Sequence, residues 1–318
     1  MKRWGWPISN DLSGMTRVAF LGTPQAAVPT LEAVSKRFEV GLVITQPDRA
    51  RGRSGTPQPG PVKETALQLE IPVVQPSSHD ELADALVGAG PFAVGIVVAY
   101  GRIIRPESLE IPEAGMLNVH FSLLPRWRGA APVSRALIEG DTMTGVTIIE
   151  LDEGLDTGPV LTAQAVDIGK TEDTGALTDR LARLGARLLV DNLAGYLDGD
   201  IIPVPQSDDG ASYASKLTKN DRELSLDAGP SAFVNRVRGM SPDPAAVVAI
   251  DDEMHKIYAA EVYGGAIGAG TWKEMDGWPV IGLSSGAVRV LSLQAPGKQR
   301  ISGESWVRGR RSATGRVG

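Results

Sequence analysis

The amino-acid sequence predicts an α/β protein: a doubly wound, mostly parallel sheet followed by a small β-barrel. Strand-like and helix-like segments alternate over about the first 200 residues, which is typical of βαβ units. Some strand-like runs, such as Ala93–Ala99 (AVGIVVA), are almost entirely apolar, as strands are when helices cover both faces of a sheet. Beyond residue 204 the pattern changes to short β-like runs separated by Gly-rich turns, which favours a barrel.

The first domain begins with a βα unit. Arg17–Gly22 (RVAFLG) is the first clear strand, and Thr23 and Pro24 follow as a cap and first-turn proline before an apolar-periodic stretch that reaches Arg37. The same reasoning predicts further strands at Val40–Thr45, Ala93–Ala99, Met116–Phe121, Gly145–Leu151 and Val160–Val166. Helices are expected at Pro61–Leu69, Asp80–Val87 and Thr174–Leu197.

A change of composition marks the domain boundary. Pro203–Ser215 (PVPQSDDGASYAS) has the composition of a linker, so the first domain is expected at 16–203, the linker at 204–215 and the barrel at 216–307. Residues 1–15 are expected to be a disordered extension, with Met15 as an alternative start, and 308–318 a disordered tail. The second domain is expected to hold one helix, Pro230–Met240, and four short strands: Ala245–Ile250, His255–Val262, Pro279–Leu283 and Val288–Leu293.

The composition excludes several classes of protein. The 318 residues are 42% hydrophobic and 22% charged, which fits a soluble globular protein with two cored domains. The chain has no cysteine, and its histidines at positions 79, 120 and 255 do not resemble a metal cluster. No run approaches the length of a membrane span. We therefore expect a cytoplasmic protein with no metal, no disulfide and no membrane partner, and a monomer.

The charge is unevenly distributed along the chain. The net charge of −6 argues against a protein that binds nucleic acid through bulk electrostatics. Residues 1–207 contain 18 Lys and Arg against 25 Asp and Glu, whereas residues 208–318 contain 14 against 13. The second domain is thus relatively basic.

One candidate site lies in the stretch MLNVHFSLLPRWRGAAP, at positions 116–132. Because side chains alternate along a strand, Asn118 and His120 share one face, and Phe121 points to the other. Pro125 ends the strand and opens an irregular segment, which is where ligands bind in open α/β sheets. A hydrogen-bonded pair in the core is the alternative interpretation.

Two loops carry further candidate residues. ELDEGLDTGPVL places acidic residues between two predicted strands, and the glycines around Asp156 indicate a tightly specified loop where the alternative is a solvated acidic turn. TQPDRARGRSGTPQPGP places Arg49, Arg51 and Arg53 on a long loop that follows a strand's carboxyl end, on the site side of the sheet. An ordinary solvated loop is the alternative there.

Taken in order, the motifs FLGTP, TQPDR…GR…PVK, VVAYGRIIRP, LNVHFSLLPRWRGAAP and GVTI…LDEGLDTGP resemble those of the methionyl-tRNA formyltransferases. The similarity extends into the second domain at YASKLTK and LSLQAPGK. It implies a Rossmann-like catalytic domain, an OB-like barrel that binds tRNA, and transfer of a formyl group from 10-formyltetrahydrofolate to the α-amino group of initiator methionyl-tRNA.

The resemblance also implies roles for particular residues. Many family members have glycine at the position of Phe121. The alternation of side chains along the strand places Phe121 on the face away from His120. Residues are carried over as a catalytic trio, a folate-contacting segment and a tRNA-binding set: Asn118, His120 and Asp156; Ser122, Leu123, Leu124 and Pro125; Arg49, Arg51, Arg53 and Lys63.

Formyl transfer gives the polar pair a chemical purpose. The reaction passes through a tetrahedral adduct with a negatively charged oxygen, to which Asn118 and His120 could both donate N–H groups. Asp156 would favour the imidazolium form of His120 or help to remove protons from the attacking amine. Neither a covalent nucleophile nor a metal is needed.

Two other functions remain open at the level of sequence. The first is another folate-dependent formyltransferase or hydrolase that uses the same trio, although the arginine loop and second domain resemble the tRNA enzyme more closely. The second is a non-catalytic RNA-binding module with the α/β domain as a scaffold.

Overall fold

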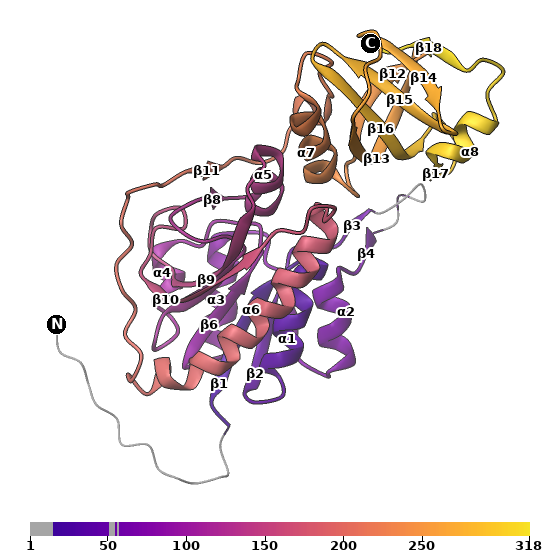
Figure 1. Cartoon of the computed structure of the whole chain (residues 1–318). Helices are drawn as coiled ribbons and strands as arrows, with labels where there is room; N and C mark the ends of the chain where they lie inside the picture. Colours follow the sequence, from indigo (N-terminus) through magenta and orange to yellow (C-terminus); the bar gives the residue numbers. More distant parts are fainter. Residues whose placement is uncertain (1–14, 51–54, 56) are drawn as a thin grey trace.

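The computed structural model describes residues 15–50, 55 and 57–318 and contains two domains joined by a long linker (Figure 1). All but the last residue of the extension expected at 1–15 lies outside this part of the chain, as do Arg51 and Arg53. None of the helices in the described part has the length and apolar composition needed to cross a bilayer.

A seven-stranded sheet forms the first domain, with the strand order β10-β9-β7-β6-β1-β2-β5. All neighbouring pairs from β7 to β5 are parallel, and β9 is antiparallel to both β7 and β10. The chain moves outward from β1 to β5 and then returns to β6 on the other side of β1, which makes a topological switch point between β1 and β6. The strands are β1 (Arg17–Gly22), β2 (Glu39–Ile44), β5 (Val73–Val74), β6 (Val94–Val98), β7 (Met116–His120), β9 (Met143–Glu150) and β10 (Val160–Asp167).

Helices cover both faces of this sheet. One core cluster lies beneath α1 and α6, and a second lies beneath α3 and α4. The near-continuous apolar strands are explained by these two cores, and the predicted doubly wound α/β architecture is confirmed. The helical segments are η1 (Gln25–Ala27), α1 (Val28–Val34), α2 (Pro61–Gln68), α3 (His79–Ala89), α4 (Pro106–Leu109), α5 (Pro132–Glu139) and α6 (Thr174–Leu197).

Two small pairs of strands organise the loops at the carboxyl ends of the sheet. The first, β3 (Arg49–Ala50) with β4 (Pro57–Gln58), is an antiparallel pair at the base of the arginine loop. The second joins β8 (Arg128–Gly129) in parallel to β11 (Tyr213–Ala214), which belongs to the linker. The linker therefore runs alongside the loop that follows β7 and is hydrogen-bonded to it (Figure 1).

The second domain is a curled antiparallel sheet with the order β12-β13-β16-β15-β14-β18, and β17 also pairs with β16. Its core includes Trp272 and Trp306, whose ring centroids are 4.8 Å apart. The predicted barrel-like second domain is confirmed as a half-barrel. Its elements are η3 (Asn220–Arg222), α7 (Pro230–Met240), β12 (Ala246–Ile250), β13 (Glu253–Tyr263), β14 (Thr271–Met275), β15 (Trp278–Leu283), β16 (Gly286–Gln294), β17 (Ile301–Ser302), α8 (Gly303–Arg308) and β18 (Thr314–Arg316).

The expectation of a disordered tail at 308–318 is wrong. Thr314–Arg316 pairs with β14 as an edge strand, and the neighbouring Val317 is buried in the core of the second domain. The basic composition of RGRRSATGRVG concealed this, because an edge strand buries few side chains and carries little apolar signal.

The two domains meet where α5 packs against α7. A Cβ at Gly239 would lie 2.9 Å from the carbonyl oxygen of Ser134, so only glycine allows the two helices to approach this closely. Arg135 Nη1 is 2.6 Å from Asp221 Oδ1 across the interface. Hydrogen bonding from this guanidinium holds the pKa of the Asp221 carboxyl far below its ordinary value, so the carboxyl stays ionised. The ion pair ties the orientation of the second domain to the first.

Candidate active site

The last residues of β7 form the floor of the site. Leu117, Val119 and Phe121 all lie in the core beneath α6, so the alternation predicted from the sequence holds along this strand. Asn118 and His120 therefore lie on the opposite face. His120 is almost fully buried, whereas Asn118 is only partly covered.

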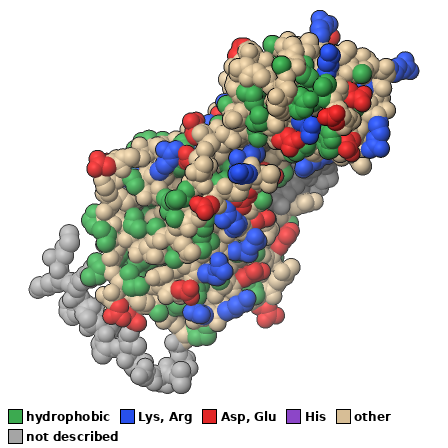
Figure 2. Space-filling view, viewed as in Figure 1, with side chains coloured by type: hydrophobic (Ala, Val, Ile, Leu, Met, Phe, Trp, Pro, Cys, Tyr) green, Lys and Arg blue, Asp and Glu red, His purple; other side chains and the backbone are tan. Residues whose placement is uncertain are grey.

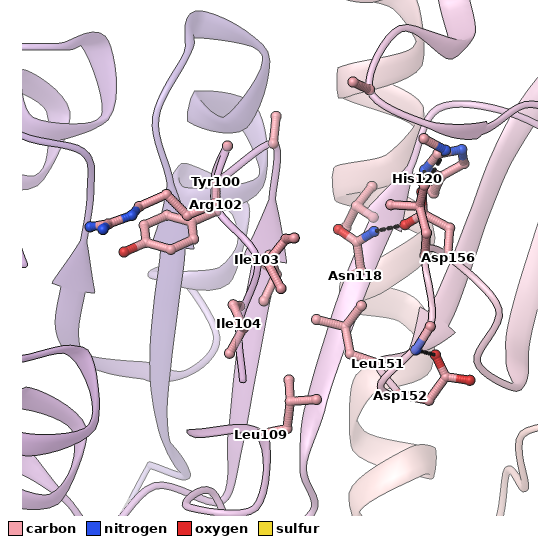
Figure 3. A pocket seen from close by; sticks show the side chains of 18 of the residues that line it. Tyr100, Arg102, Ile103, Ile104, Leu109, Asn118, His120, Leu151, Asp152 and Asp156 are labelled. Carbon is pink, nitrogen blue, oxygen red and sulfur yellow. Dashed lines mark hydrogen bonds and ion pairs between the residues drawn. The ribbon is translucent and has the colours of Figure 1, made fainter. Parts of the chain in front are cut away.

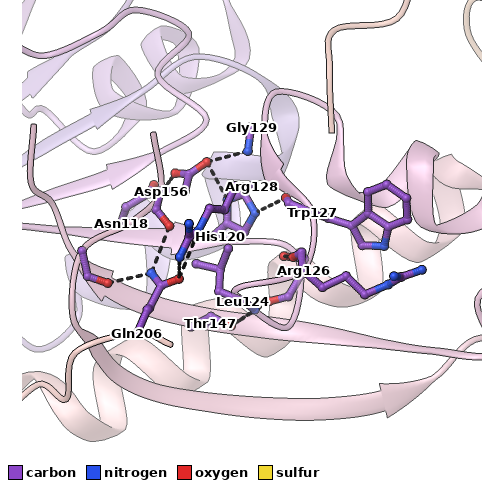
Figure 4. Close-up of polar contacts among 12 residues, drawn as sticks. Asn118, His120, Leu124, Arg126, Trp127, Arg128, Gly129, Thr147, Asp156 and Gln206 are labelled. Atoms are coloured by element: carbon purple, nitrogen blue, oxygen red, sulfur yellow. Dashed lines mark hydrogen bonds and ion pairs between the residues drawn. The ribbon is translucent and has the colours of Figure 1, made fainter. Parts of the chain in front are cut away.

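Asp156 reaches this pair from the loop between β9 and β10 (Figure 4). Its Oδ1 accepts a hydrogen bond from Asn118 Nδ2 at 3.3 Å, and its Oδ2 accepts one from the backbone N–H of Gly129 at 2.8 Å. The same Oδ2 lies 3.6 Å from His120 Nδ1. The structure thus brings Asn118, His120 and Asp156 together in one polar cluster.

The other nitrogen of His120 determines which ring atom faces the site. His120 Nε2 is 2.9 Å from the carbonyl oxygen of Trp127. A carbonyl can only accept, so the hydrogen bond assigns a proton to Nε2. Nδ1 faces Asp156, and it can donate a hydrogen bond only when the ring is an imidazolium.

Glycines allow the loops to close around Asp156. Gly129 has a φ of +117°, and a Cβ there would lie 2.9 Å from the carbonyl oxygen of Ala214 in the linker strand. A Cβ at Gly158 would overlap the carbonyl oxygen of Glu150. Asp156 itself has a φ of +54°, in the left-handed region that residues other than glycine seldom adopt, although aspartate is found there more often than most. The surrounding contacts therefore help to stabilise a less common backbone conformation at this residue.

A cavity of about 500 Å³ opens beside the cluster (Figure 3). One wall is the segment that follows β6, where Tyr100, Arg102 and Ile103 lie, and the other contains Asn118, His120 and Asp156. Burial raises the pKa of the Tyr100 phenol, with the nearby Arg102 acting in the opposite direction. Phe121 also lines the cavity, although it belongs to the core beneath α6. Cavities of this size hold drug-sized organic ligands.

A second cavity, of about 270 Å³, shares Ala99, Tyr100 and Gly101 with the first. Its other residues come from the segments that follow β1 and β2, including Thr23 and Gln46. The two cavities therefore meet at the switch point between β1 and β6, where α/β sheets commonly bind ligands.

The segment expected to contact folate lies beside the larger cavity without lining it. None of its residues, Ser122, Leu123, Leu124 and Pro125, belongs to the cavity wall. Thr147 on β9 holds the segment: its Oγ1 donates to the carbonyl oxygen of Ser122 at 2.7 Å and accepts from the backbone N–H of Leu124 at 3.1 Å. The folate role of these four residues stays a prediction.

The tRNA-binding candidates fall into different environments. Arg49 is exposed and lines the smaller cavity, whereas Arg51 and Arg53 lie outside the described residues. Lys63 Nζ donates to Asp48 Oδ2 and to Gln75 Oε1, both at 2.7 Å. Its ammonium group therefore binds the start of the arginine loop in this structure.

Sequence reasoning missed the residues that hold the cluster from behind. Gln206, in the linker, hydrogen-bonds to the backbone of the Asp156 loop and to Arg128, which is almost fully buried (Figure 4). A single glutamine in a polar linker gives no recognisable signal. Over the described part of the chain, no group of three His, Asp or Glu side chains is arranged to hold a metal ion.

Comparisons with known proteins show which family the chain is similar to. Residues 16–193 match the family model described as formyl transferase, and residues 216–311 match the one described as formyl transferase, C-terminal domain. Among curated relatives, the methionyl-tRNA formyltransferase of Aromatoleum aromaticum is 44% identical over 92% of this chain and 94% of its own length. That of Heliobacterium modesticaldum is 42% identical over 94% of this chain and 98% of its own length.

Solved structures share the fold at much lower identity. An N-formyltransferase from Helicobacter canadensis, in complex with folinic acid and dTDP-3-aminofucose, has a TM-score of 0.68 and 19% identity over 88% of this chain and 100% of its own. Glycinamide ribonucleotide transformylase 1 from Symbiobacterium toebii has a TM-score of 0.51 and 20% identity over 63% of this chain and 99% of its own.

The α/β fold and the match of residues 16–193 to the family model define a formyl transferase. More particularly, the chain belongs to the methionyl-tRNA formyltransferase family, because relatives of that name are about as long and 38% to 44% identical over more than nine-tenths of it. The resemblance found in the sequence is thereby confirmed.

Proposed function

We propose that this enzyme transfers the formyl group of 10-formyltetrahydrofolate to the α-amino group of initiator methionyl-tRNA, for use in translation initiation in the cytoplasm. The observation that carries the proposal is the cluster of Asn118, His120 and Asp156 at the side of a cavity large enough for a folate. The smaller adjoining cavity provides room for the aminoacyl end of the tRNA.

In the reaction, the amine nitrogen attacks the formyl carbon and forms a new C–N bond. The resulting tetrahedral adduct carries negative charge on the formyl oxygen, to which Asn118 Nδ2 and a protonated His120 Nδ1 donate hydrogen bonds. The bond from carbon to N10 of the folate then breaks. The amine loses one proton and N10 gains one, so the products are formylmethionyl-tRNA and tetrahydrofolate.

Asp156 has two compatible roles in this reaction. Its Oδ2, 3.6 Å from His120 Nδ1, stabilises the imidazolium that donates to the oxyanion. Its carboxylate can also accept the proton that leaves the amine, directly or through water. No step requires a metal or a covalent enzyme intermediate. The cluster belongs to one chain, so a monomer is sufficient for catalysis.

The tRNA is held, in this proposal, by the arginine loop and the second domain. Arg49 lies at the smaller cavity, and Arg51 and Arg53 follow it in sequence. Figure 2 shows acidic and basic side chains interspersed over α6 and also on the second domain, whose outer edge carries several basic side chains. The second domain is favoured over the face of the first by its charge balance, 14 Lys and Arg against 13 Asp and Glu in residues 208–318, compared with 18 against 25 in residues 1–207.

The decisive experiment mixes the protein with 10-formyltetrahydrofolate and charged initiator tRNA and measures formylmethionyl-tRNA. A parallel reaction supplies an amino-sugar nucleotide as acceptor, because solved neighbours of similar fold include a sugar N-formyltransferase. Product on the tRNA alone supports the proposal. Product on the sugar nucleotide alone would assign a different acceptor, and tight tRNA binding without turnover would indicate a binding module.

A further inference from the structure

We propose that Gln206 is a positioning residue for Asp156, and that the interdomain linker is therefore part of the active-site framework. The inference rests on the proposed formyl-transfer function. The inference is carried by hydrogen bonds that connect the linker both to the backbone of the Asp156 loop and to the segment that binds the Asp156 carboxylate (Figure 4).

The amide of Gln206 bridges two structures. Its Nε2 donates to the carbonyl oxygens of Asp156 at 2.9 Å and Gly158 at 2.7 Å. Its Oε1 accepts from Arg128, at 3.0 Å from Nη2 and 3.3 Å from Nε. Only this orientation of the amide satisfies all four contacts, because two carbonyls need donors and the guanidinium needs an acceptor.

Arg128 depends on this amide. Its side chain is 3% exposed, and its other side-chain partner, Asp208, is 90% exposed and 3.0 Å away at the surface. An exposed carboxylate is a weak partner, whereas a buried guanidinium without hydrogen bonds is strongly unfavourable. Gln206 is therefore the partner that secures Arg128 inside the protein.

These contacts support both the backbone and the side chain of Asp156. Gln206 holds the backbone carbonyl of Asp156 directly, and it holds Arg128, whose neighbour Gly129 donates to the Asp156 carboxylate. The left-handed backbone of Asp156 and the direction of its side chain thus have a common support. Loss of that support should let the carboxylate move away from His120, and a displacement of about 1 Å can lower a rate by about a hundredfold.

Gln206 does not line the cavity, so it acts through Asp156 and not on the substrates. Substitution should therefore lower kcat and leave the KM values nearly unchanged. The linker also contacts the loop that follows β7 at other points: Trp127 N–H donates to Ser212 Oγ at 3.0 Å, and β11 pairs with β8. The segment between the domains is thus built into the site and is more than a tether.

Two substitutions separate the contacts of Gln206. Gln206→Ala removes all of them. Gln206→Glu keeps an acceptor for Arg128 and so protects the fold, but it removes both donors to the loop. Ser207→Ala is the control, since this neighbour is exposed and, within the described part of the chain, its Oγ accepts a hydrogen bond only from the backbone N–H of Asp209. For each variant, kcat and KM for both substrates are measured, with hydrogen exchange of residues 152–159.

We expect Gln206→Ala and Gln206→Glu to lower kcat by about tenfold to a hundredfold, with KM within about twofold, because loss of an outer support commonly has an effect of this size. Exchange of residues 152–159 should accelerate in both variants and stay parental in Ser207→Ala. Parental kcat in folded Gln206→Glu would overturn the proposal, whether or not exchange changes. If the parent forms no formylmethionyl-tRNA, the proposed function fails instead; faster exchange in the variants would still support the anchoring, and parental exchange would refute it.

Discussion

Asp156→Asn tests the central feature of the site with little change of shape. Asparagine is isosteric with aspartate, and its Oδ1 can still accept the hydrogen bond from Gly129 N–H, which measures 2.8 Å in the parent. The substitution removes the negative charge 3.6 Å from His120 Nδ1. With the amide oxygen in the place of Oδ2, the NH₂ group takes the place of Oδ1 and faces the Nδ2 donor of Asn118. No carboxylate then remains to stabilise the imidazolium, so the ring is expected in its neutral form with its one proton on Nε2, bound to the Trp127 carbonyl.

The expected loss follows from that change of protonation. A neutral His120 has no N–H left for the oxyanion, so the variant loses one transition-state donor. Removal of one such donor typically lowers kcat by about 10² to 10³, which corresponds to about 2.7–4 kcal/mol. His120→Ala and Asn118→Ala should show losses of the same order, while tRNA affinity remains nearly parental.

Single-turnover transfer of labelled formyl groups is the appropriate assay, because it measures the chemical step separately from product release. Asp167→Asn serves as the control, since it removes the same charge at an exposed position at the end of β10. A folded Asp156→Asn enzyme with a chemical step as fast as that of Asp167→Asn would refute the role assigned to this carboxylate.

Three further predictions concern the core, the tRNA and the second domain. Phe121→Ala should destabilise the protein by about 3–5 kcal/mol in denaturant unfolding and leave low-temperature activity intact; lost folate binding at unchanged stability would contradict this. Triple alanine substitution of Arg49, Arg51 and Arg53 should make the slope of log tRNA affinity against log salt concentration shallower by about 2. Burial lowers the pKa of His255 from 6.5, so the unfolded chain binds this proton more readily and stability should fall as the pH drops below 6.5. His255→Gln should flatten that decline in thermal melts at several pH values, whereas an unchanged decline would assign it to other groups.

Most of the secondary structure of the first domain could be predicted because its signals are local. Arg17–Gly22 and Thr174–Leu197 have the bounds that the sequence indicated. Apolar runs identify buried strands, and a 24-residue amphipathic pattern identifies a helix, without reference to the rest of the chain. Short elements were missed for the same reason: β3, β8 and β11 contain two residues each, too few for any period.

The residues of the candidate site could be predicted where they are close in sequence, and were harder to predict where distant segments bring them together. Asn118 and His120 could be paired from strand alternation alone, since they are two residues apart. Asp156 lies 38 residues from Asn118, and only its glycine-rich loop and the family resemblance indicated it. Gln206 lies a further 50 residues beyond Asp156 and has no pattern at all.

Hydrogen bonds between distant segments explain why Gln206 escaped notice and why it matters. A buried polar group must find a partner, but the sequence does not say which segment provides it. Arg128 lies in the loop after β7, three residues beyond Pro125, and looks like a solvated loop cation, yet it is buried and requires an acceptor. The linker supplies that acceptor and, with the same side chain, two donors for the Asp156 loop. A truncation at residue 203, which composition alone would recommend as the end of the catalytic domain, would therefore remove a support of the catalytic carboxylate along with the second domain.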